Sequence, residues 1–498
     1  MPLTSLDCLA VGKPYPFACE AKRMKAYTDG RALLSGDHSD VFGDIVKLMR
    51  RDGRPGDSFV QLATPKRIVK AFNGLVFGEP PEFKAKGVSE ADDGEAAQEQ
   101  MESYIEEMDL LQEAHQSLTD VQSLGDGVLK VTLADKGVAG QYPDINAVDP
   151  CIWYPVVSER DKQDITAHIL CWTWERKEGG KTVVNIRAEV HEPGTVTTWL
   201  GTVEGGKFKT LALEEMLDAG GLVTANPSST GVDECLVVPM FNFRSSADCT
   251  GVSDFADLSP ILQEITVRLY LIASILDKHS DPKLAGPRSL VAEINGENVV
   301  PEMDYIPLED NEAVPQYVTW EGQLTAAWHE VDFLTDQALF AMEASRALFG
   351  DITGNVTSGA ALKRLLIAPL LKASVLRGCM DIGLKKALRL ASLLHNTVDP
   401  SAIIFEDVDI VWNDGLPDDE LEQMTIHAGY VVARLESRED AIRALFKSTG
   451  AELEARIARL DAEVASMLPA RPPLVLPSLA PMPLLGAPDM SGAPGAVV

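Results

Sequence analysis

Basic residues are scarce in this sequence, and their shortage argues against one large class of function. The 498-residue chain has 44 Lys and Arg against 75 Asp and Glu, a formal net charge of −31. Proteins that bind nucleic acid by neutralising phosphates carry clustered Lys and Arg. The composition instead suits a protein that repels nucleic acid or binds cationic partners.

Paired cysteines and long apolar runs are also missing. The seven cysteines are scattered, their number is odd and none forms a CxxC pair, which indicates free thiols in a reducing compartment. No run of 18 apolar residues occurs, so we expect no membrane span. The apolar stretch Leu9–Val11 is too short for a signal peptide. We therefore expect intracellular synthesis in a bacterium.

Catalytic signatures are absent as well. The sequence contains no GxxxxGK[ST], GxGxxG, GxSxG or HExxH motif, and its eight histidines are dispersed. His38 with Asp40, and the carboxylates of Glu406, Asp407 and Asp409, are more simply surface groups than metal ligands. We expect no enzyme, cofactor or metal. An active site built from dispersed residues stays an open alternative.

Alternation of apolar and polar residues fills the stretch from Asp120 to Phe243, and this pattern is typical of strands. The predicted strands are Gly127–Leu133, Ile145–Val148, Ile152–Val156, Ile165–Glu175, Thr182–Val190, Thr195–Thr202 and Val237–Phe243. Pro239 suits a sheet edge, because proline cannot donate to the ladder. With helical patterns on either side, an α+β fold with an antiparallel sheet is expected. A strand at Ile403–Trp412 is expected to pair back with this sheet.

Two helices are predicted at the centre of the chain. The first has apolar residues three and four apart, at Leu262, Ile265, Leu269, Ile272 and Leu276. Ser259 before Pro260 is its expected N-cap. The second, about 323–349, places these residues on or near one face: Leu324, Trp328, Val331, Leu334, Ala338, Met342 and Phe349.

An insertion separates these helices, and a loop and a long basic helix follow them. The insertion, Pro282–Thr319, contains five prolines and the hairpin signal Asn295-Gly296. The loop, Gly350–Gly359 (GDITGNVTSG), has no cation and no large aromatic residue. The third helix, 360–395, carries seven cations against Asp381, whereas each of the first two has a net charge of −3. Pro369 predicts a kink within it.

The remaining segments are less distinctive. The acidic run from Glu82 to Gln98 is interpreted as a solvated face. Two helices are predicted at about 418–435 and 438–467, with Ser437 capping the second. The last stretch, Leu468–Val498, contains eight prolines and little charge, so it cannot build a core and is predicted to be disordered.

The order of these elements resembles the portal proteins of tailed bacteriophages with siphovirus-like heads. The motifs that carry the resemblance are Phe72–Pro80 (FNGLVFGEP), Gly125–Leu133 (GDGVLKVTL), Val148–Pro155 (VDPCIWYP), Phe241–Leu258 and Phe349–Leu366. No single motif is sharp. The resemblance lies in their order over roughly 400 residues, and in the order of elements from 254 to 420.

The resemblance implies a domain plan. It divides the chain into a wing (1–253, completed by a strand within 396–416), two stem helices (254–281 and 320–349), a clip (282–319), a tunnel loop (350–359), a long kinked helix (360–395), a crown (417–468) and the proline-rich tail (469–498). The tail has no place in the family plan. The implied assembly is a dodecameric ring at one capsid vertex, a channel through which double-stranded DNA is packaged and ejected.

The resemblance also implies partners and site residues. The partners are further copies of the chain, double-stranded DNA, the large terminase, major capsid protein, scaffolding protein and a head-completion protein, in the host cytoplasm and then the virion. The expected tunnel loop is Gly350, Asp351, Ile352, Thr353, Gly354, Asn355, Val356, Thr357 and Ser358. Candidates for DNA-facing or inter-subunit cations are Lys363, Arg364 and Lys372. Candidates for the docking clip are Arg288, Asn295, Glu297 and Asn298.

A head-to-tail ring has support from the residues themselves. Ile261, Val267, Leu271 and Ile275 lie off the main stripe of the first central helix and form a second apolar face. A heterologous contact that closes on itself gives a ring. Two alternatives remain at this point: another capsid or tail protein without a channel, and a nucleic-acid-processing enzyme.

Overall fold

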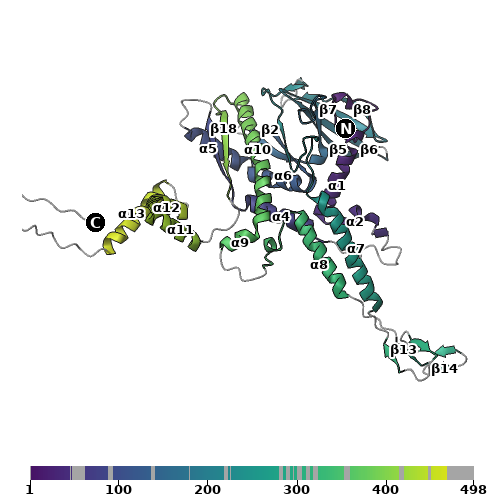
Figure 1. Cartoon of the computed structure of the whole chain (residues 1–498). Coiled ribbons are helices and arrows are strands. Elements are labelled where there is room, and N and C mark those ends of the chain that lie inside the picture. Colours follow the sequence, from purple (N-terminus) through teal and green to yellow (C-terminus); the bar gives the residue numbers. More distant parts are fainter. Residues whose placement is uncertain are drawn as a thin grey trace, which may run out of the picture. The chain divides into compact units, whose positions relative to one another are not determined.

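The computed structural model forms two compact units, Met1–Pro417 and Asp418–Val498 (Figure 1). The structure describes residues 2–44, 46–47, 62–87, 94–135, 141–178, 180–217, 223–224, 226–279, 284–287, 292–294, 297–299, 305–309, 314–317, 324–352, 359–413, 420–446 and 450–467. The predicted α+β class with antiparallel sheets is confirmed in the larger unit.

Helices from the first part of the chain pack around a large buried cluster. They are α1 (Ala21–Ser35), α2 (His38–Val41), α4 (Thr64–Phe77), α5 (Glu95–Glu107) and α6 (Leu110–Leu124). The buried face of α6 includes Leu110, Ala114, Leu118 and Val121, whose steps of four, four and three draw one helical stripe. Gly125 ends α6 at a φ of +100°, and a Cβ there would lie 2.7 Å from the backbone of Val252 and Ser253. Only glycine therefore lets these two segments meet so closely.

Two antiparallel sheets form the β-region. Their strands are β2 (Asp126–Asp135), β3 (Gln141–Val148), β4 (Trp153–Val157), β5 (Ile165–Glu178), β6 (Lys181–Glu192), β7 (Thr195–Glu204), β8 (Lys207–Leu213), β11 (Ser228–Ser229) and β12 (Val237–Phe241), with a small separate pair of β9 (Met216–Leu217) and β10 (Val223–Thr224). One sheet runs β11–β7–β6–β5–β4 with β8 also on β7, and the other runs β12–β2–β3. All seven strands predicted between 120 and 243 are confirmed. Pro239 lies on the edge strand β12, opposite Val128, as its missing donor requires.

The pairing predicted for the late strand is wrong, although the strand exists. β18 (Phe405–Val411) pairs antiparallel with β1 (Glu82–Gly87), a strand outside the two larger sheets. β1 lies in the acidic run interpreted as a solvated face, yet Phe83 is buried. The side chain of Gln98 in α5 bonds to Phe83 O at 3.0 Å and Ala85 N at 3.2 Å. These bonds from α5 occupy the edge of β1 that does not pair with β18. β1 is short, and its alternation of apolar and polar residues is weak.

The first central helix, α7 (Phe255–His279), starts within one residue of the predicted stem helix 254–281, but ahead of the expected cap Ser259. Ser253 Oγ accepts a hydrogen bond from Phe255 N at 3.0 Å and donates one to Ser123 O at 2.6 Å. Ser253 therefore takes the capping role expected of Ser259, and Pro260 lies inside the first turns. The buried stripe is confirmed at Leu262, Ile265 and Ile272, whereas Leu276 is half exposed.

Part of α7 has the length and composition of a membrane span. The window Phe255–Asp277 has a mean hydropathy of 1.2 and is one-third buried. Glu264 and Arg268 interrupt it, and its most apolar stripe packs along α8 (Leu324–Ala341). A core helix of a soluble protein can have the same length and hydropathy, so these features are weak evidence for a membrane span.

The insertion between α7 and α8 is built from short strands. β13 (Leu284–Pro287) pairs in parallel with β16 (Tyr305–Leu308) and antiparallel with β17 (Gln316–Tyr317). β14 (Ala292–Ile294) pairs antiparallel with β15 (Glu297–Val299). Ile294 stands opposite Glu297, which is the register of a two-residue hairpin loop and confirms the predicted hairpin.

The second central helix ends sooner than predicted. α8 stops at Ala341, and Phe349 belongs to a separate 3-10 turn, η7 (Arg346–Phe349). Glu343 adopts a φ of +54°, with Ala344 N bonded to Leu339 O at 2.8 Å and Glu343 N to Phe340 O at 3.0 Å. This pair of bonds closes a helix end of the Schellman type.

The long basic helix is divided by proline, as predicted. α9 (Gly359–Leu365) and α10 (Ile367–Val398) meet at Leu366, three residues before Pro369. Pro369 has no N–H to offer the carbonyl of Leu365, so the helical ladder breaks there. α10 packs against β2, β3, β12 and β18 (Figure 1).

The smaller unit contains α11 (Glu420–Val432), α12 (Arg438–Phe446) and α13 (Gly450–Met467). Ser437 Oγ accepts from Asp440 N at 3.0 Å, which confirms the predicted cap, although α12 ends at Phe446 and the predicted single helix is two. The tail from 468 onward lies outside the described residues.

Candidate oligomer and channel surfaces

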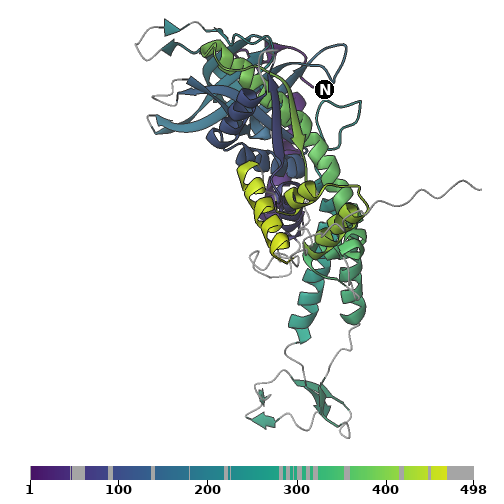
Figure 2. The same ribbon diagram turned by 90° about the vertical axis from the view of Figure 1, so that its left-hand side faces the viewer.

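Helices α7 and α8 form an antiparallel helical hairpin (Figure 2). They run side by side in opposite directions, with Val331, Ala338 and Leu339 of α8 buried. Because each helix buries the side that faces its partner, their outer faces point in opposite directions. The hairpin therefore offers two different surfaces to other molecules.

The outer face of α8 carries exposed aromatic side chains. Phe333 and Phe340 are 61% and 79% exposed and lie seven residues apart, hence on one face. Trp328, expected on the buried face, is also half exposed. Soluble monomers rarely expose a group of large apolar side chains, and such groups mark contact surfaces.

The second apolar face that the sequence predicted for α7 is partly covered within the subunit. Leu271 is 41% exposed, and Ile275 is partly buried. Ile261 and Val267 are also partly buried and pack against the main core cluster. Leu271 is therefore the side chain of this set that is most open to another molecule.

A third apolar surface follows α10. Ile367, Leu371, Val375 and Ile382 are 61–73% exposed. Their helical spacing puts them on one face that extends for about 22 Å. This face was not among the predictions from the sequence. Its spacing is visible in the sequence, but spacing alone does not separate an exposed stripe from a buried one.

Most cations of α10 are used inside the chain. Arg377 donates to Leu75 O at 2.5 Å, Lys385 pairs with Asp381 and Asp409 at 3.1 and 3.2 Å, and Arg389 pairs with Glu234. These partners lie on α4, on β18, on the segment before β12 and, for Asp381, on α10 itself. The helix thus pairs with acidic and carbonyl groups of its own subunit.

Lys372 is not on a DNA-facing surface. It is 8% exposed, and its Nζ lies 2.6 Å from Asp254 Oδ1. The expectation of a DNA or inter-subunit contact is therefore corrected for this residue, because its charge is neutralised within the chain. Lys363 and Arg364 on α9 are exposed, as a DNA contact requires.

The expected tunnel loop is described only at its beginning. Gly350, Asp351 and Ile352 are exposed, with Gly350 at a φ of +83°. Asp351 lies 3.7 Å from Arg346, which also pairs with Asp336 at 2.5 Å. Thr353, Gly354, Asn355, Val356, Thr357 and Ser358 lie outside the described residues.

The expected clip residues are placed in part. Glu297 and Asn298 lie on β15, with Asn298 opposite Glu293. Arg288 and Asn295 lie outside the described residues. The structure thus gives the strand framework of the insertion.

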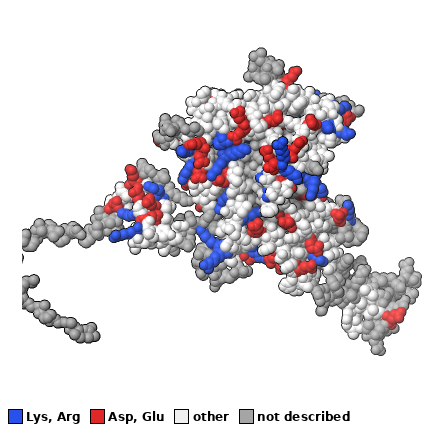
Figure 3. All heavy atoms as spheres, turned by 45° about the horizontal axis from the view of Figure 1, so that its top comes forward, with Lys and Arg blue, Asp and Glu red and all other residues white. Residues whose placement is uncertain are grey.

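Charge on the larger unit is mixed. On the face shown in Figure 3, Lys and Arg are interspersed with Asp and Glu, and neutral surface separates them. Among the described residues on that face, no broad basic area forms. A duplex would find scattered contacts there and not a continuous cationic track.

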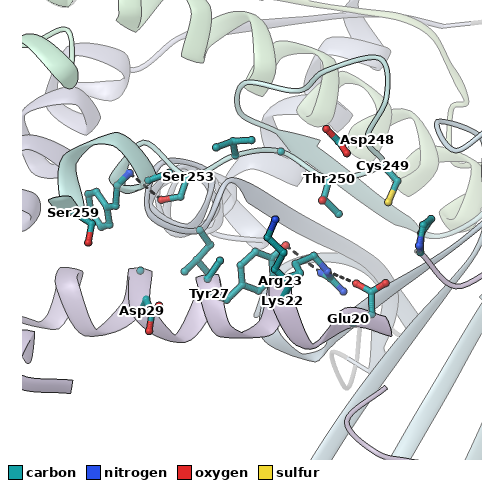
Figure 4. A pocket seen from close by; sticks show the side chains of 18 of the residues that line it. Glu20, Lys22, Arg23, Tyr27, Asp29, Asp248, Cys249, Thr250, Ser253 and Ser259 are labelled. Carbon is teal, nitrogen blue, oxygen red and sulfur yellow. Dashed lines mark hydrogen bonds and ion pairs between the residues drawn. The ribbon is translucent and has the colours of Figure 1, made fainter. Parts of the chain in front are cut away.

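A hollow of about 790 Å³ lies between α1, the start of α7 and residues 248–253 (Figure 4). Arg23 is the centre of a hydrogen-bonded group in its wall. Arg23 donates to Glu20 at 2.6 Å, to Tyr27 Oη at 3.1 Å and to Trp153 O at 2.9 Å. Partial burial raises the pKa of the Cys19 and Cys249 thiols, which line this hollow.

The same network continues to a fully buried carboxylate. Tyr27 donates to Asp126 Oδ2, and Gly251 N donates to Asp126 Oδ1 at 2.7 Å. Burial raises the pKa of Asp126 to about 6 in spite of these hydrogen bonds. The network therefore ties α1 and β2 to the segment that leads into α7, and its evident role is to hold this junction.

A second polar group joins the two large sheets. Lys130 of β2 pairs with Glu189 of β6 at 2.5 Å, and His191 Nε2 lies 3.2 Å from the same carboxylate. The ammonium of Lys130 and the ring nitrogen of His191 hold the pKa of Glu189 at about 2, although burial opposes them. The sequence analysis did not single out these residues, whose partners lie on separate strands.

No known protein-family model matches the chain, and no curated protein matches it significantly. The resemblance to portal proteins is therefore a hypothesis that the geometry of the chain has to support.

Proposed function

We propose that this chain is the subunit of a bacteriophage portal, a ring at one capsid vertex that forms the channel for packaging and ejection of double-stranded DNA. The observation that carries the proposal is the arrangement of the α7–α8 hairpin. It contains a small strand-rich insertion, and a glycine-bearing segment and the divided helix α9–α10 follow it. This order is the one that the resemblance implies for stem, clip, tunnel loop and kinked helix.

Ring formation is supported by the two outer faces of the hairpin. The exposed aromatic face of α8 and the exposed part of α7 around Leu271 lie on different helices and differ in their side chains. A contact between unlike faces of successive copies is heterologous, and such contacts form closed rings when the rotation between copies closes. The exposed face of α10 adds further apolar surface for the same assembly.

The charge of the chain suits a channel wall. Duplex DNA carries about one charge per 1.7 Å of axis, and each neutralised phosphate adds affinity. A wall that bound tightly would stall a moving duplex. A subunit with a net charge of −31, whose α10 cations are largely paired within the chain, repels DNA except at scattered contacts.

The remaining parts take the roles that the resemblance implies. The insertion 284–317 docks the large terminase during packaging and the head-completion protein afterwards. The sheet region meets major capsid protein and scaffolding protein, and residues 420–467 form the crown. Lys363 and Arg364 on α9 are exposed and are the cations that we assign to DNA contacts beside the tunnel loop.

Deletion of Ile352–Thr357 tests the proposal. We expect rings to assemble normally, because the deleted residues lie outside the helical hairpin, and we expect packaged DNA per particle to fall. A variant with six Gly and Ser residues in the same place separates the length of the segment from its side chains. Unchanged packaging and retention in the deletion variant would show that this segment is not the tunnel loop.

A further inference from the structure

Three segments of the larger unit meet at one buried ammonium. Lys372 of α10 lies 2.6 Å from Asp254, which precedes α7, and 3.9 Å from Glu343, which ends α8. The Lys372 side chain is 10% exposed. A cation buried to this extent needs anionic partners to be stable.

Asp254 is the fixed partner. Its backbone N donates to Gln122 O of α6 at 3.0 Å, and its Oδ1 accepts from Asn242 Nδ2 at 2.8 Å. The contact of Lys372 with Asp254 therefore attaches α10 to the junction of α6 and the segment after β12. The other carboxylate oxygen, Oδ2, is buried without a hydrogen-bond partner among the described residues.

Glu343 is the exposed partner, and its backbone conformation is unusual. It holds the left-handed position that closes α8, where glycine or asparagine is the ordinary residue. A glutamate in that position costs free energy that a favourable contact must offset. Its carboxylate is 55% exposed and reaches toward Lys372, so the contact gives a reason for glutamate at this site.

We propose that Lys372 is a positioning residue that holds the end of α8 against the α6–α7 junction through Glu343. The chain leaves this point through η7 and Gly350–Ile352, so the contact sets where the following segment begins. That this segment contacts DNA rests on the proposed function, whereas the positioning itself does not.

Hydrogen exchange on the full-length protein tests the proposal. In Glu343→Gln, we expect the amides of residues 339–352 to exchange roughly two- to fivefold faster than in the wild type, the size that a partly exposed ion pair supports. Amides of β2 should be unchanged. Glu159→Gln, which removes an exposed carboxylate between β4 and β5, is the control and should leave residues 343–352 as in the wild type.

The salt dependence of hydrogen exchange shows whether the Glu343 charge holds the end of α8 or whether other contacts do. At about 1 M salt, screening should bring the wild type close to Glu343→Gln, because the Glu343 carboxylate is accessible to ions. Equal exchange of wild type and variant at low salt would overturn the proposal, as would a difference that salt leaves unchanged. Lys372→Met gives a second test. If that variant does not fold, Glu343→Gln still tests the proposal, because the Glu343 side chain is exposed and its replacement should not prevent folding.

The same Glu343→Gln variant keeps this inference distinct from the proposed function. Faster local exchange with normal DNA packaging would support the positioning role and contradict the link to the tunnel loop. Normal exchange with impaired packaging would overturn the positioning role and leave the portal proposal standing.

Discussion

Arg268 of α7 and Glu330 of α8 face each other across the helical hairpin, with Nε and Oε1 3.0 Å apart. Arg268 also pairs with Glu264, one turn away on its own helix, at 2.8 Å. One guanidinium thus lies between two carboxylates and links the two helices by charge near the middle of α7, although its Nε–H is not aligned for a hydrogen bond.

Reversing the charge of Arg268 should weaken this hairpin. Arg268→Glu places three carboxylates together, and we expect a loss of roughly 1 kcal/mol in the free energy of unfolding, since the groups are partly exposed. The double variant Arg268→Glu with Glu330→Arg should recover part of that loss. Thermal unfolding of the three proteins measures it, and no recovery in the double variant would mean that the pair does not couple the helices.

Assembly should depend on the outer face of α8. Phe340 is 79% exposed, so Phe340→Glu should leave the fold of the subunit intact while it places a charge in the contact that we propose between copies. We expect native mass spectrometry to show subunits in place of the oligomer. Val11→Glu, at another exposed apolar residue, is the matched control and should assemble normally. An intact oligomer in Phe340→Glu would exclude this face from the contact.

The junction between α1 and the start of α7 should depend on one hydroxyl. Tyr27→Phe leaves Asp126 Oδ2 and one Arg23 N–H without their partner in a buried site. We expect a loss of about 1–3 kcal/mol in the free energy of unfolding. Tyr430→Phe removes a half-exposed hydroxyl and should change stability little, so denaturant titrations of both variants isolate the effect of burial.

The two sheets should become less stable in acid through His168. Burial first, and then the nearby His191 and Lys386, lower the pKa of His168 from 6.5 to about 3. Below pH 6.5 the unfolded chain binds a proton that the folded chain refuses, so stability falls as pH drops toward 3. At about pH 4.5 the loss from this group is on the order of 2–3 kcal/mol.

His168→Gln tests this pH dependence. The glutamine keeps an acceptor for Trp153 Nε1, which donates to His168 at 3.0 Å, but cannot be protonated. We expect stability of the variant to fall less steeply than that of the wild type between pH 6.5 and 4. Comparison with the wild type cancels the opposite contribution of Asp126, whose pKa burial raises. Parallel stability curves would contradict the assignment.

Local patterns predicted the strands well, because alternation is a property of consecutive residues. β5 shows why: Ala167, Ile169 and Cys171 enter one buried cluster while Leu170 enters another. The features that were not predicted depend on contacts between distant segments. Ser253 caps α7 because Ser123 lies beside it, and β18 pairs with β1 across more than 300 residues of sequence.

The candidate surfaces were predicted less completely. The cations of α10 were recognised, but their partners Asp254, Glu234 and Leu75 come from distant segments, so the sequence did not show which cations were already neutralised. The exposed stripe from Ile367 to Ile382 has the same spacing as a core stripe. Only its surroundings show that it is uncovered.

Electron microscopy of the purified full-length protein shows whether the chain assembles into a portal ring. We expect closed rings with a central opening wide enough for duplex DNA, and with α7–α8 hairpins of successive copies in contact around it. A compact monomer, an open filament, or a ring whose segment 350–359 lies far from the opening would contradict the portal proposal.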